Sequence, residues 1–398
     1  MSDTQKHTKP NVPNLRFPGF SGEWEEHTIG HYIKIQGGYA FKSEAFRDNG
    51  IPIIRISNFP QNSNTVDLSD CVYYDDGPYT NYIVKDGDLL IAMSGATTGK
   101  IAIYRSLRKA FLNQRVGCFR SIGNIYYPIL YALVQSPAFQ SQLGKKLIAG
   151  AQPNISSSDI ETIRVNLPSS NEQEKIASFL NIIDQRIAIQ SKIIEQYQSL
   201  IRAIIQKAQS VSTKRVQLRD VLTERKELNS QDYDICSVSV SRGIVNQVEY
   251  LGRSFAAKET SNYHVVHFGD IVYTKSPTGD FPYGIIKQSN IKSPVAVSPL
   301  YGVYEPETIE IGKYLHYYFC SPGNALNYLH PLIQKGAKNT INITNQHFLD
   351  NTVPFPDEKI LGTTVAAITS LAYRCNLEED ALCCYTKQKE YLLKNLFM

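Results

Sequence analysis

The longest regular pattern of apolar positions in this chain lies in the segment 169–212. Apolar residues recur there in alternating steps of four and three over about four heptads, and a glutamine interrupts the row once. Such a seam is typical of a helix that pairs with another helix in a coiled coil. The predicted seam consists of Ile176, Leu180, Ile183, Ile187, Gln190, Ile194, Tyr197, Ile201 and Ile204.

A second, weaker seam lies in the segment 357–398, where Glu378 and Lys389 interrupt the apolar row. A helix of about 39 residues is roughly 58 Å long, which is longer than a small body of the chain needs to cover itself. We therefore predict that the two helices form an antiparallel coiled coil. The alternative is that each helix packs only on its own body. The second seam consists of Ile368, Leu371, Leu382, Tyr385, Leu392 and Leu396.

Gln190 allows two interpretations. A polar residue in a seam can fix the register of two helices at a cost in stability. Alternatively, Gln190 faces a partner subunit or water.

The segments that precede the two helices repeat the same landmarks in the same order, at offsets of 182, 185 and 186 residues. Offsets that drift slowly are what small loop insertions in a duplicated half produce. The matching landmarks are 84–89 with 266–271, 136–137 with 321–322, and 150–155 with 336–341. A strand bounded by proline then follows each copy, VNLP at 165–168 and VPFP at 353–356.

Short apolar runs between these landmarks are typical of strands, as at 51–57, 88–94 and 270–276. The sequence therefore predicts an α+β chain with two pseudo-symmetric, strand-rich mixed α/β bodies, separated by the two long helices. The predicted parts are an N-terminal arm at 1–23, a first body at 24–168, a first long helix at 169–212, a second body at 213–356 and a second long helix at 357–398.

Composition adds little to this picture. The chain has 398 residues and a net charge of +4, so a basic surface would have to come from arrangement, not from excess charge. There are 7 cysteines and no C-x-x-C pair. The polar N-terminal segment does not resemble a secretory signal, and no run of 18 apolar residues predicts a membrane span. We expect a cytoplasmic protein with reduced thiols and no membrane association.

Familiar catalytic and metal-binding motifs do not occur. Gly95-Ala-Thr-Thr-Gly99-Lys100 has one residue too few between its glycines for a phosphate loop and lacks the following Ser or Thr, so we predict a tight turn there. His264 and His267 form an H-x-x-H pair at the end of a predicted strand, without the helical spacing that zinc sites use. We predict no catalytic residues and no metal site in this chain.

Five segments together resemble a known family, the specificity (S) subunits of type I restriction-modification systems. The most specific is Q-x-K-I-A-S-F-L-N-I-I-D-Q-R-I at 173–187, which follows a proline-bounded strand. The second copy departs from it, because E-K-I-L-G at 358–362 lacks the F-L and I-D that follow in the first. The other segments are W-E-E-H-T-I-G at 24–30, I-P-I-I-R-I-S-N at 51–58, and the G-D-L and G-D-I strands at 87–89 and 269–271.

This resemblance implies two target recognition domains, each of which reads one half of a bipartite, asymmetric double-stranded DNA site. It implies two methylation (M) subunits docked on the helices and two restriction (R) motor-nuclease subunits. S-adenosylmethionine, ATP and Mg²⁺ would belong to those partners, and the assembled complex would be the DNA adenine methyltransferase and ATP-dependent endonuclease. This chain itself would need no cofactor. Two other hypotheses remain: an enzyme with an unrecognised site, and a coiled-coil adaptor or scaffold without DNA specificity.

Polar side chains in loops after strands are the candidates for reading base edges, because Arg, Lys, Asn, Gln, Ser and Thr carry the required donors and acceptors. Lys145 and Lys146 are better suited to phosphates, since a lysine acts as a point charge. In the first body the candidates are Arg55, Asn58, Thr97, Thr98, Lys100, Asn113, Gln114 and Arg115. In the second body they are Lys275, Ser276, Thr278, Lys335, Lys338 and Asn339.

Overall fold

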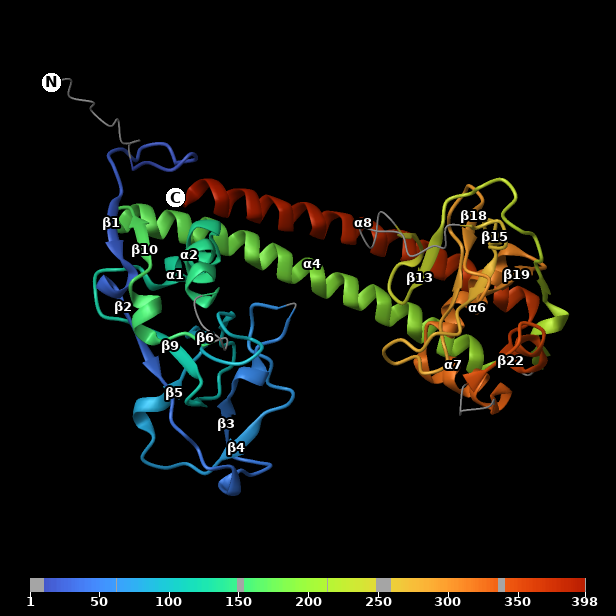
Figure 1. The fold of residues 1–398 in the computed structure, drawn as a ribbon, viewed down its shortest axis with the longest axis horizontal. Helices are drawn as coiled ribbons and strands as arrows, with labels where there is room; N and C mark the ends of the chain where they lie inside the picture. Colours follow the sequence, from blue (N-terminus) through green and yellow to red (C-terminus); the bar gives the residue numbers. More distant parts are fainter. Residues whose placement is uncertain are drawn as a thin grey trace. The chain divides into compact units, whose positions relative to one another are not determined.

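The computed structural model describes residues 11–61, 63–148, 154–212, 214–247, 259–335 and 341–397 (Figure 1). The chain divides into two compact units. The first unit comprises residues 1–189 and 382–398, and the second comprises residues 190–381. Both long helices therefore contribute to both units. Within the described residues, no helix has the length and the apolar character that a bilayer crossing requires.

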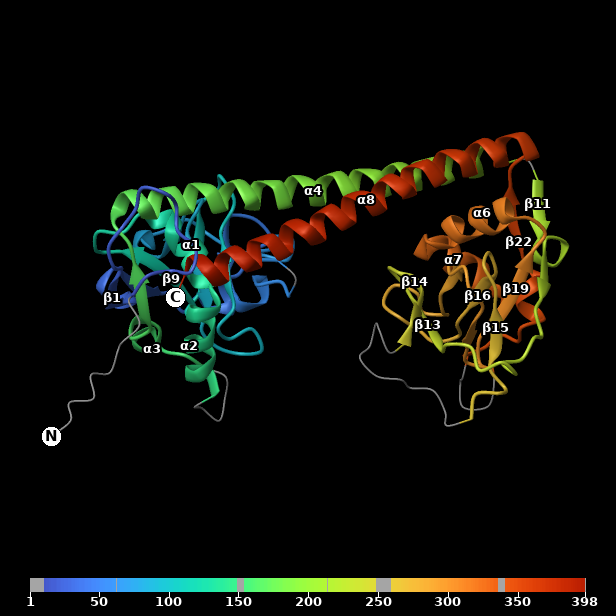
Figure 2. The same ribbon diagram turned by 90° about the horizontal axis from the view of Figure 1, so that it is seen from above.

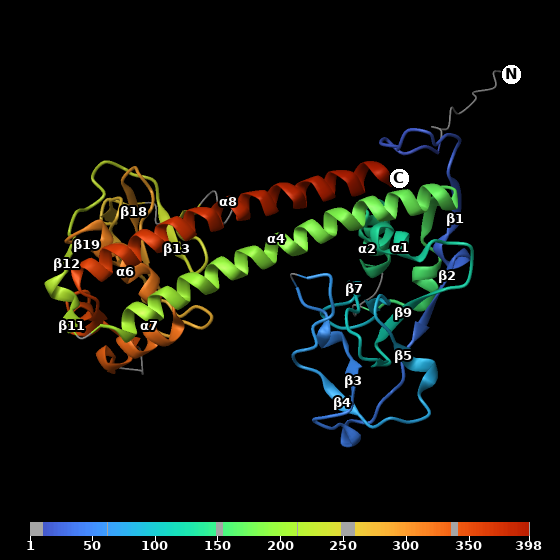
Figure 3. The ribbon, with the colours of Figure 1, turned by 180° about the vertical axis from the view of Figure 1, so that it is seen from behind.

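The first unit contains two four-stranded sheets and one separate antiparallel strand pair (Figure 3). The pair joins β1 (Glu25–Thr28) to β10 (Arg164–Leu167), so the first and last strands of the body lie side by side. One sheet is antiparallel, in the order β2 (Ile33–Gly37), β9 (Val116–Ser121), β6 (Leu89–Ala92) and β7 (Ile101–Ile103). The other is mixed, in the order β4 (Val72–Tyr74), β3 (Ile51–Ile54), β8 (Ala110–Leu112) and β5 (Ile83–Val84).

Strand β6 shows why this sheet lies between two layers. Side chains alternate across a strand, so Leu89 and Ile91 point to one face while Leu90 and Ala92 point to the other. The first two join a core built with the helices, and the other two join a second core beneath the mixed sheet. All four residues are buried, which explains why this strand has no polar position.

Three helices follow the sheets of the first unit: α1 (Tyr127–Gln135), α2 (Pro137–Ile148) and α3 (Ser157–Glu161). The repeated Ser-Pro landmark is explained by a helix start, because proline suits the first position of a helix, where its missing N–H costs nothing. Pro137 begins α2 in this way, and Pro322 begins α7 of the second unit, where Ser321 caps the helix.

The second unit repeats the strand pair, the antiparallel sheet and the helices of the first unit, and we call this shared set of elements the frame (Figure 2). The strand pair is β11 (Lys214–Gln217) with β22 (Thr352–Phe355). The antiparallel sheet has the order β12 (Leu222–Glu224), β19 (Gly302–Pro306), β16 (Ile271–Tyr273) and β17 (Ile286–Gln288). The helices are α6 (Ile309–Phe319) and α7 (Pro322–Leu329). Strand for strand this order matches that of the first unit, so the predicted duplication is confirmed.

The two units differ in their outer strands. The second unit has separate two-stranded sheets where the first has the mixed sheet. They are β13 (Cys236–Ser239) with β14 (Gly243–Asn246), β15 (His264–Val266) with β18 (Val295–Val297), and β20 (Gln334–Lys335) with β21 (Ile341–Asn342). The fold is thus α+β, with one shared frame and two different outer layers.

The two long helices are α4 (Ser170–Ser210) and α8 (Glu358–Leu396). In the first unit, Leu180 near the start of α4 shares a core with Leu392 near the end of α8. In the second unit, Ile201 near the end of α4 shares a core with Leu361 near the start of α8. Within each unit the helices therefore run antiparallel.

The predicted seam residues are not all equally buried. Ile176, Leu180, Ile183, Gln190, Ile194, Ile201, Ile368, Leu392 and Leu396 are buried, whereas Ile187, Tyr197, Ile204, Leu371, Leu382 and Tyr385 are half-buried. Toward the end of α4 the buried position shifts from Ile204 to Ile205. A straight helix drifts by about 20° per heptad relative to a strict seven-residue repeat, which accounts for a shift of one position.

The polar interruptions of the two seams each have a partner on the other long helix of the same unit. In the second unit the Gln190 amide donates to the backbone carbonyl of Glu378 at 3.2 Å and also to its carboxylate. In the first unit the Lys389 ammonium forms an ion pair with Asp184 at 2.5 Å. Gln190 thus faces the other helix of its own chain.

The N-terminal arm of the first unit is attached to both long helices. Arg16 forms an ion pair with the buried Glu172 of α4 at 2.7 Å. The Leu15 N–H donates to the carbonyl of Asn395 in α8 at 2.9 Å. The arm therefore lies where the first turns of α4 and the last turns of α8 meet.

Candidate nucleic-acid interface

Three loops of the first body, each following a strand, are joined by hydrogen bonds. The Thr97 hydroxyl donates to the carbonyl of Ile56 at 3.1 Å, and the N–H of Met93 donates to the carbonyl of Arg115 at 2.9 Å. These contacts bring the eight candidate base-reading residues of the first body into one group of loops. The loops follow β3, β6 and β8 and comprise residues 55–58, 94–100 and 113–115.

The loop after β6 is the predicted tight turn. Gly95 and Gly99 both have φ of +82°, a conformation that favours glycine, so this prediction is confirmed. A Cβ on Gly99 would come within 2.6 Å of the Leu147 side chain of α2. The second glycine therefore also allows the turn to pack closely on that helix.

A cleft of about 260 Å³ lies between this turn and α2. Burial lowers the pKa of Lys100, whose side chain lines the cleft. Polar groups and a leucine share the lining, which gives the cleft hydrogen-bond donors and acceptors beside an apolar wall. The lining includes Gln61, Thr97, Thr98, Lys100, Gln140 and Leu147.

The candidate residues of these loops fall into two groups. Gln114 and Arg115 are exposed, and within the described residues their side chains make no hydrogen bond. Asn58 is buried: its amide oxygen accepts the N–H of Arg55 at 2.8 Å, and its NH₂ donates to the carbonyl of Asp67 at 3.0 Å. Gln114 and Arg115 are free to contact a ligand, while Asn58 shapes the loop that carries Arg55.

The two lysines of α2 also differ. Lys145 is exposed, and within the described residues its ammonium has no partner. Lys146 donates to the Thr162 hydroxyl at 2.8 Å. Lys145 is therefore the better candidate for a phosphate contact, because its charge is not engaged by the fold.

In the second body, three candidates lie in the loop after β16, the strand that corresponds to β6. Ser276 and Thr278 are exposed, and Thr278 exchanges two backbone hydrogen bonds with Phe281, at 3.0 and 3.1 Å, which closes a tight turn. Burial lowers the pKa of Lys275, although the Glu224 carboxylate opposes this shift. Lys335 is described only as a backbone position of β20, and Lys338 and Asn339 lie outside the described residues.

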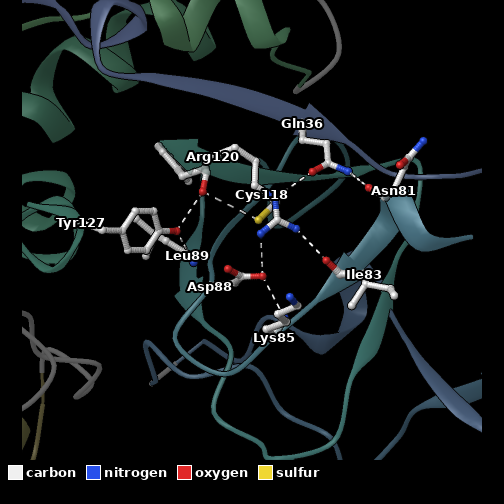
Figure 4. Close-up of polar contacts among 10 residues, drawn as sticks. Gln36, Asn81, Ile83, Lys85, Asp88, Leu89, Cys118, Arg120 and Tyr127 are labelled. Atoms are coloured by element: carbon white, nitrogen blue, oxygen red, sulfur yellow. Dashed lines mark hydrogen bonds and ion pairs between the residues drawn. The ribbon is translucent and has the colours of Figure 1, made fainter. Parts of the chain in front are cut away.

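A half-buried ion pair that the sequence analysis missed lies at the start of β6, at the other end of that strand from the candidate loop 94–100 (Figure 4). Arg120 of β9 donates to the Asp88 carboxylate at 2.8 Å, to the Gln36 side-chain oxygen at 2.7 Å and to the Ile83 carbonyl at 2.7 Å. The same carboxylate accepts the N–H of Lys85 at 2.8 Å. Asp88 thus fixes the turn that leads into β6.

The second body has an equivalent pair. Arg225 donates two hydrogen bonds to the Asp270 carboxylate, at 2.8 and 3.1 Å, and contacts Glu305 at 3.1 Å. Asp270 also accepts the N–H of His267 at 2.8 Å. Burial raises the pKa of Asp270 and outweighs the opposing effect of Arg225. The aspartate of each G-D landmark therefore fixes the turn that leads into β6 or β16. The sequence alone does not reveal this role.

The H-x-x-H pair is engaged in other contacts. His264 forms a hydrogen bond with the carbonyl of Tyr301 at 2.9 Å, and His267 contacts the Glu227 carboxylate at 2.7 Å. Across the ranges described, no three His, Cys, Asp or Glu residues are grouped as a metal site would require.

Comparison with known proteins finds several that are similar to this chain. Residues 21–198 match the family model described as "Type I restriction modification DNA specificity domain". The chain is 31% identical over 192 residues to the type I restriction enzyme MjaVIII specificity subunit of Methanocaldococcus jannaschii, a match that covers 46% of this chain and 44% of that protein. It is 26% identical over 170 residues to the EcoAI specificity subunit of Escherichia coli, covering 41% of this chain and 28% of that protein.

These matches span less than half the length of the curated relatives. The fold comparison extends further. The crystal structure of the type I restriction-modification S subunit from M. genitalium superposes with a TM-score of 0.63 at 13% identity, covering 97% of this chain and 99% of that one. The sequence matches and the fold together confirm the resemblance to specificity subunits.

Proposed function

We propose that this chain, whose residues 21–198 match the model of the type I restriction-modification DNA specificity domain, is the non-catalytic subunit that reads a split DNA site. One observation carries the proposal: two bodies share one frame but have different outer strands, and each has polar residues in the loop after the corresponding strand β6 or β16. A shared frame suits two bodies that each bind one half of a DNA site. Unlike outer layers suit two different half-sites.

Direct reading by the first body centres on Gln114 and Arg115. Both are exposed side chains of the kinds that recognise base edges, Arg toward guanine and Gln toward adenine. Lys145 would contact a phosphate, which positions the protein without reading sequence. In the second body the candidates are Ser276 and Thr278, beside Lys275, in the loop after β16, which corresponds to the loop after β6.

The helices offer apolar surface for partner subunits. Ile182 and Ile189 of α4 are exposed in the first unit, one helical heptad apart and so on one face of the helix. Tyr373 and Leu377 of α8 are exposed in the second unit and are four residues apart, so they also lie on one face of their helix. We propose that two methylation subunits dock on these faces and that two restriction subunits join them. S-adenosylmethionine, ATP and Mg²⁺ would bind those partners.

Mapping of methylated bases tests this function. The full chain is expressed with its methylation subunit in a host that lacks other adenine methylation, and the methylated motif is read across the genome. The expected result is a split, asymmetric motif. Replacing residues 24–168 by the first body of another specificity subunit should change one half of the motif and leave the other. A change in both halves at once would contradict modular reading.

Point variants sharpen the test. Arg115→Ala should lower specific affinity by about 1–3 kcal/mol and relax the motif at one position. Lys145→Ala should weaken binding to all sequences equally and reduce the salt dependence by about one phosphate contact. Arg108→Ala, an exposed arginine outside the three loops, is the matched control and should change neither. A chain that binds no DNA at any salt concentration, but still assembles, would instead be an adaptor.

A further inference from the structure

The second body contains a partly buried group of nucleophilic and basic side chains to which DNA reading gives no role. Cys320 at the end of α6 lies 3.3 Å from the ammonium of Lys287 in β17, and 3.9 Å from the Nε2 of His316. Lys287 is only 5% exposed. Within the described residues, its ammonium has no partner other than the Cys320 sulfur.

A buried ammonium is unfavourable unless a negative charge or hydrogen-bond acceptors compensate it. A neutral thiol is a weak acceptor, whereas a thiolate supplies both the charge and the acceptor. The position of Cys320 at the carboxyl end of α6 disfavours a negative charge. The compensation must therefore come from Lys287 and not from the helix dipole.

His316 contributes a hydrogen bond and not a second positive charge. Its Nδ1 accepts the backbone N–H of Gln288 at 3.0 Å, so this nitrogen carries no proton and Nε2 carries one. This N–H contacts the Cys320 sulfur, with 3.9 Å between Nε2 and Sγ. The sulfur thus receives a proton donor from His316 as well as from Lys287.

We propose that Cys320 is held as a thiolate by Lys287 and His316, and that it is a modification site for small electrophiles of the hydroperoxide class. Burial alone would raise the pKa of Cys320, but the charge of Lys287 and the hydrogen bonds from Lys287 and His316 outweigh it and lower the pKa. Among the titratable side chains of α6, Tyr317 is the phenol that interacts with Cys320 and with Cys375 of α8. Burial raises the pKa of Tyr317 to about 12, so this phenol stays neutral when the thiolate forms.

The chemistry is a two-electron oxidation. The thiolate sulfur attacks one oxygen of hydrogen peroxide, an S–O bond forms, the O–O bond breaks, and hydroxide leaves. Sulfur is oxidised, the peroxide is reduced, and the product is sulfenic acid. Because Cys320 is partly exposed, a small oxidant can reach it where a large disulfide cannot. Oxidation removes the counter-charge of Lys287, so it should destabilise the contact between β17 and α6.

The chain contains its own control thiols. Cys383 and Cys384 are both exposed, on the last part of α8. Alkylation of the full chain by iodoacetamide is followed by mass spectrometry from pH 5 to pH 9. The rate at Cys320 should rise at a lower pH than the rate at the control thiols, as its lowered pKa requires. A midpoint at Cys320 equal to that of the controls, or no reaction there in the folded chain, overturns the proposal.

Two variants test the cause. Lys287→Met removes the charge and keeps the length of the side chain, and it should slow alkylation of Cys320 at pH 7 by roughly tenfold or more. Lys287→Arg keeps the charge and should retain most of the rate. An unchanged rate in Lys287→Met overturns the proposal. If Lys287→Met does not fold, the pH profile of the unaltered chain still decides.

The oxidation itself is tested with hydrogen peroxide followed by dimedone, which traps sulfenic acid. The expected result is labelling of Cys320 ahead of Cys383 and Cys384, together with a lower Tm of the treated chain. Labelling of the exposed thiols first overturns the proposal. This inference does not depend on the proposed DNA reading.

Discussion

The two bodies place an ion pair at the same point of the same sheet but take the arginine from opposite strands. In the first body Arg120 lies on β9 and faces Gln36 of β2. In the second, Arg225 follows β12 and faces Glu305 of β19. Because β2 corresponds to β12 and β9 to β19, the cation has moved to the neighbouring strand while the aspartate has stayed. The frame requires a cation beside this carboxylate, and either strand can supply it.

The pairs also differ in exposure. The Asp270 side chain is 2% exposed and that of Asp88 is 16% exposed. A charge left without its partner costs more where water is excluded. The same change should therefore have a larger effect in the second body than in the first.

The largest effect is expected for Arg225→Met. It leaves the Asp270 carboxylate buried without its main cation, and we expect a loss of about 3 kcal/mol in the free energy of unfolding of the second unit at pH 7. Urea denaturation followed by circular dichroism, with hydrogen exchange of β16 and β17, measures it. A loss well below about 1 kcal/mol would show that the pair is dispensable.

The same variant has a defined pH dependence. Burial already raises the pKa of Asp270, and loss of Arg225 should raise it further. The folded state of the variant then binds this proton more readily than the unfolded state, so its stability falls as pH rises through the raised pKa. The deficit relative to the unaltered chain should be smaller at pH 4 than at pH 7. An equal deficit at both values would contradict a charge effect.

The second-largest effect is expected for a double variant that places the cation of the second body on β19, as the first body has it on β9. Arg225→Gln alone should be destabilising, and adding Glu305→Arg should restore about 2 kcal/mol, because the new cation reaches the same carboxylate from β19. Arg225→Gln with Glu305→Gln is the matched control, since it removes the repulsion but adds no cation. Equal stability of the two double variants would mean that the strands are not interchangeable.

A smaller effect is expected for Arg120→Met in the first body. Asp88 keeps the N–H of Lys85 and has more contact with water, so the loss should be about 1–2 kcal/mol. The measurement is the same, with hydrogen exchange of β6 and β9. A loss larger than that of Arg225→Met would reverse the comparison.

The smallest effect is expected for Gln190→Leu in the helix pair of the second unit. The variant adds an apolar seam residue but removes the donor to Glu378, and we expect a change below about 1 kcal/mol together with some association of chains. Gln198→Leu, an exposed position of the same helix, is the control. If neither stability nor the oligomeric state changes, the hypothesis that Gln190 fixes the register is wrong.

Local patterns predicted the parts of this fold that depend on local sequence. The long helices, the Ser-Pro helix starts, the strand of 88–94 and the turn at Gly95 follow from periodicity and from the backbone preferences of proline and glycine. The duplication follows from the order of landmarks. The order of strands in the sheets could not be predicted, because pairing of β2 with β9 joins residues far apart in the sequence.

The candidate site was predicted in outline only. Residue type and position after a strand pointed to the right loops, but they could not distinguish the exposed Arg115 from the buried Asn58. An asparagine in a loop serves a ligand or its own backbone with the same atoms, and only the fold decides between them. The ion pair of Arg225 was missed because its partner Asp270 is 45 residues away.

The first unit is assembled from the beginning and the end of the chain, and this has a consequence during synthesis. Its core includes Leu392, Leu396 and Phe397, and the arm at Leu15 bonds to Asn395. At roughly 5–20 residues per second, the ribosome needs on the order of ten to forty seconds to pass from residue 189 to residue 382. Throughout that delay the nascent N-terminal half presents an unfilled apolar groove along α4. Chaperones or a partner subunit would bind this apolar surface until the last turns of α8 have been synthesised.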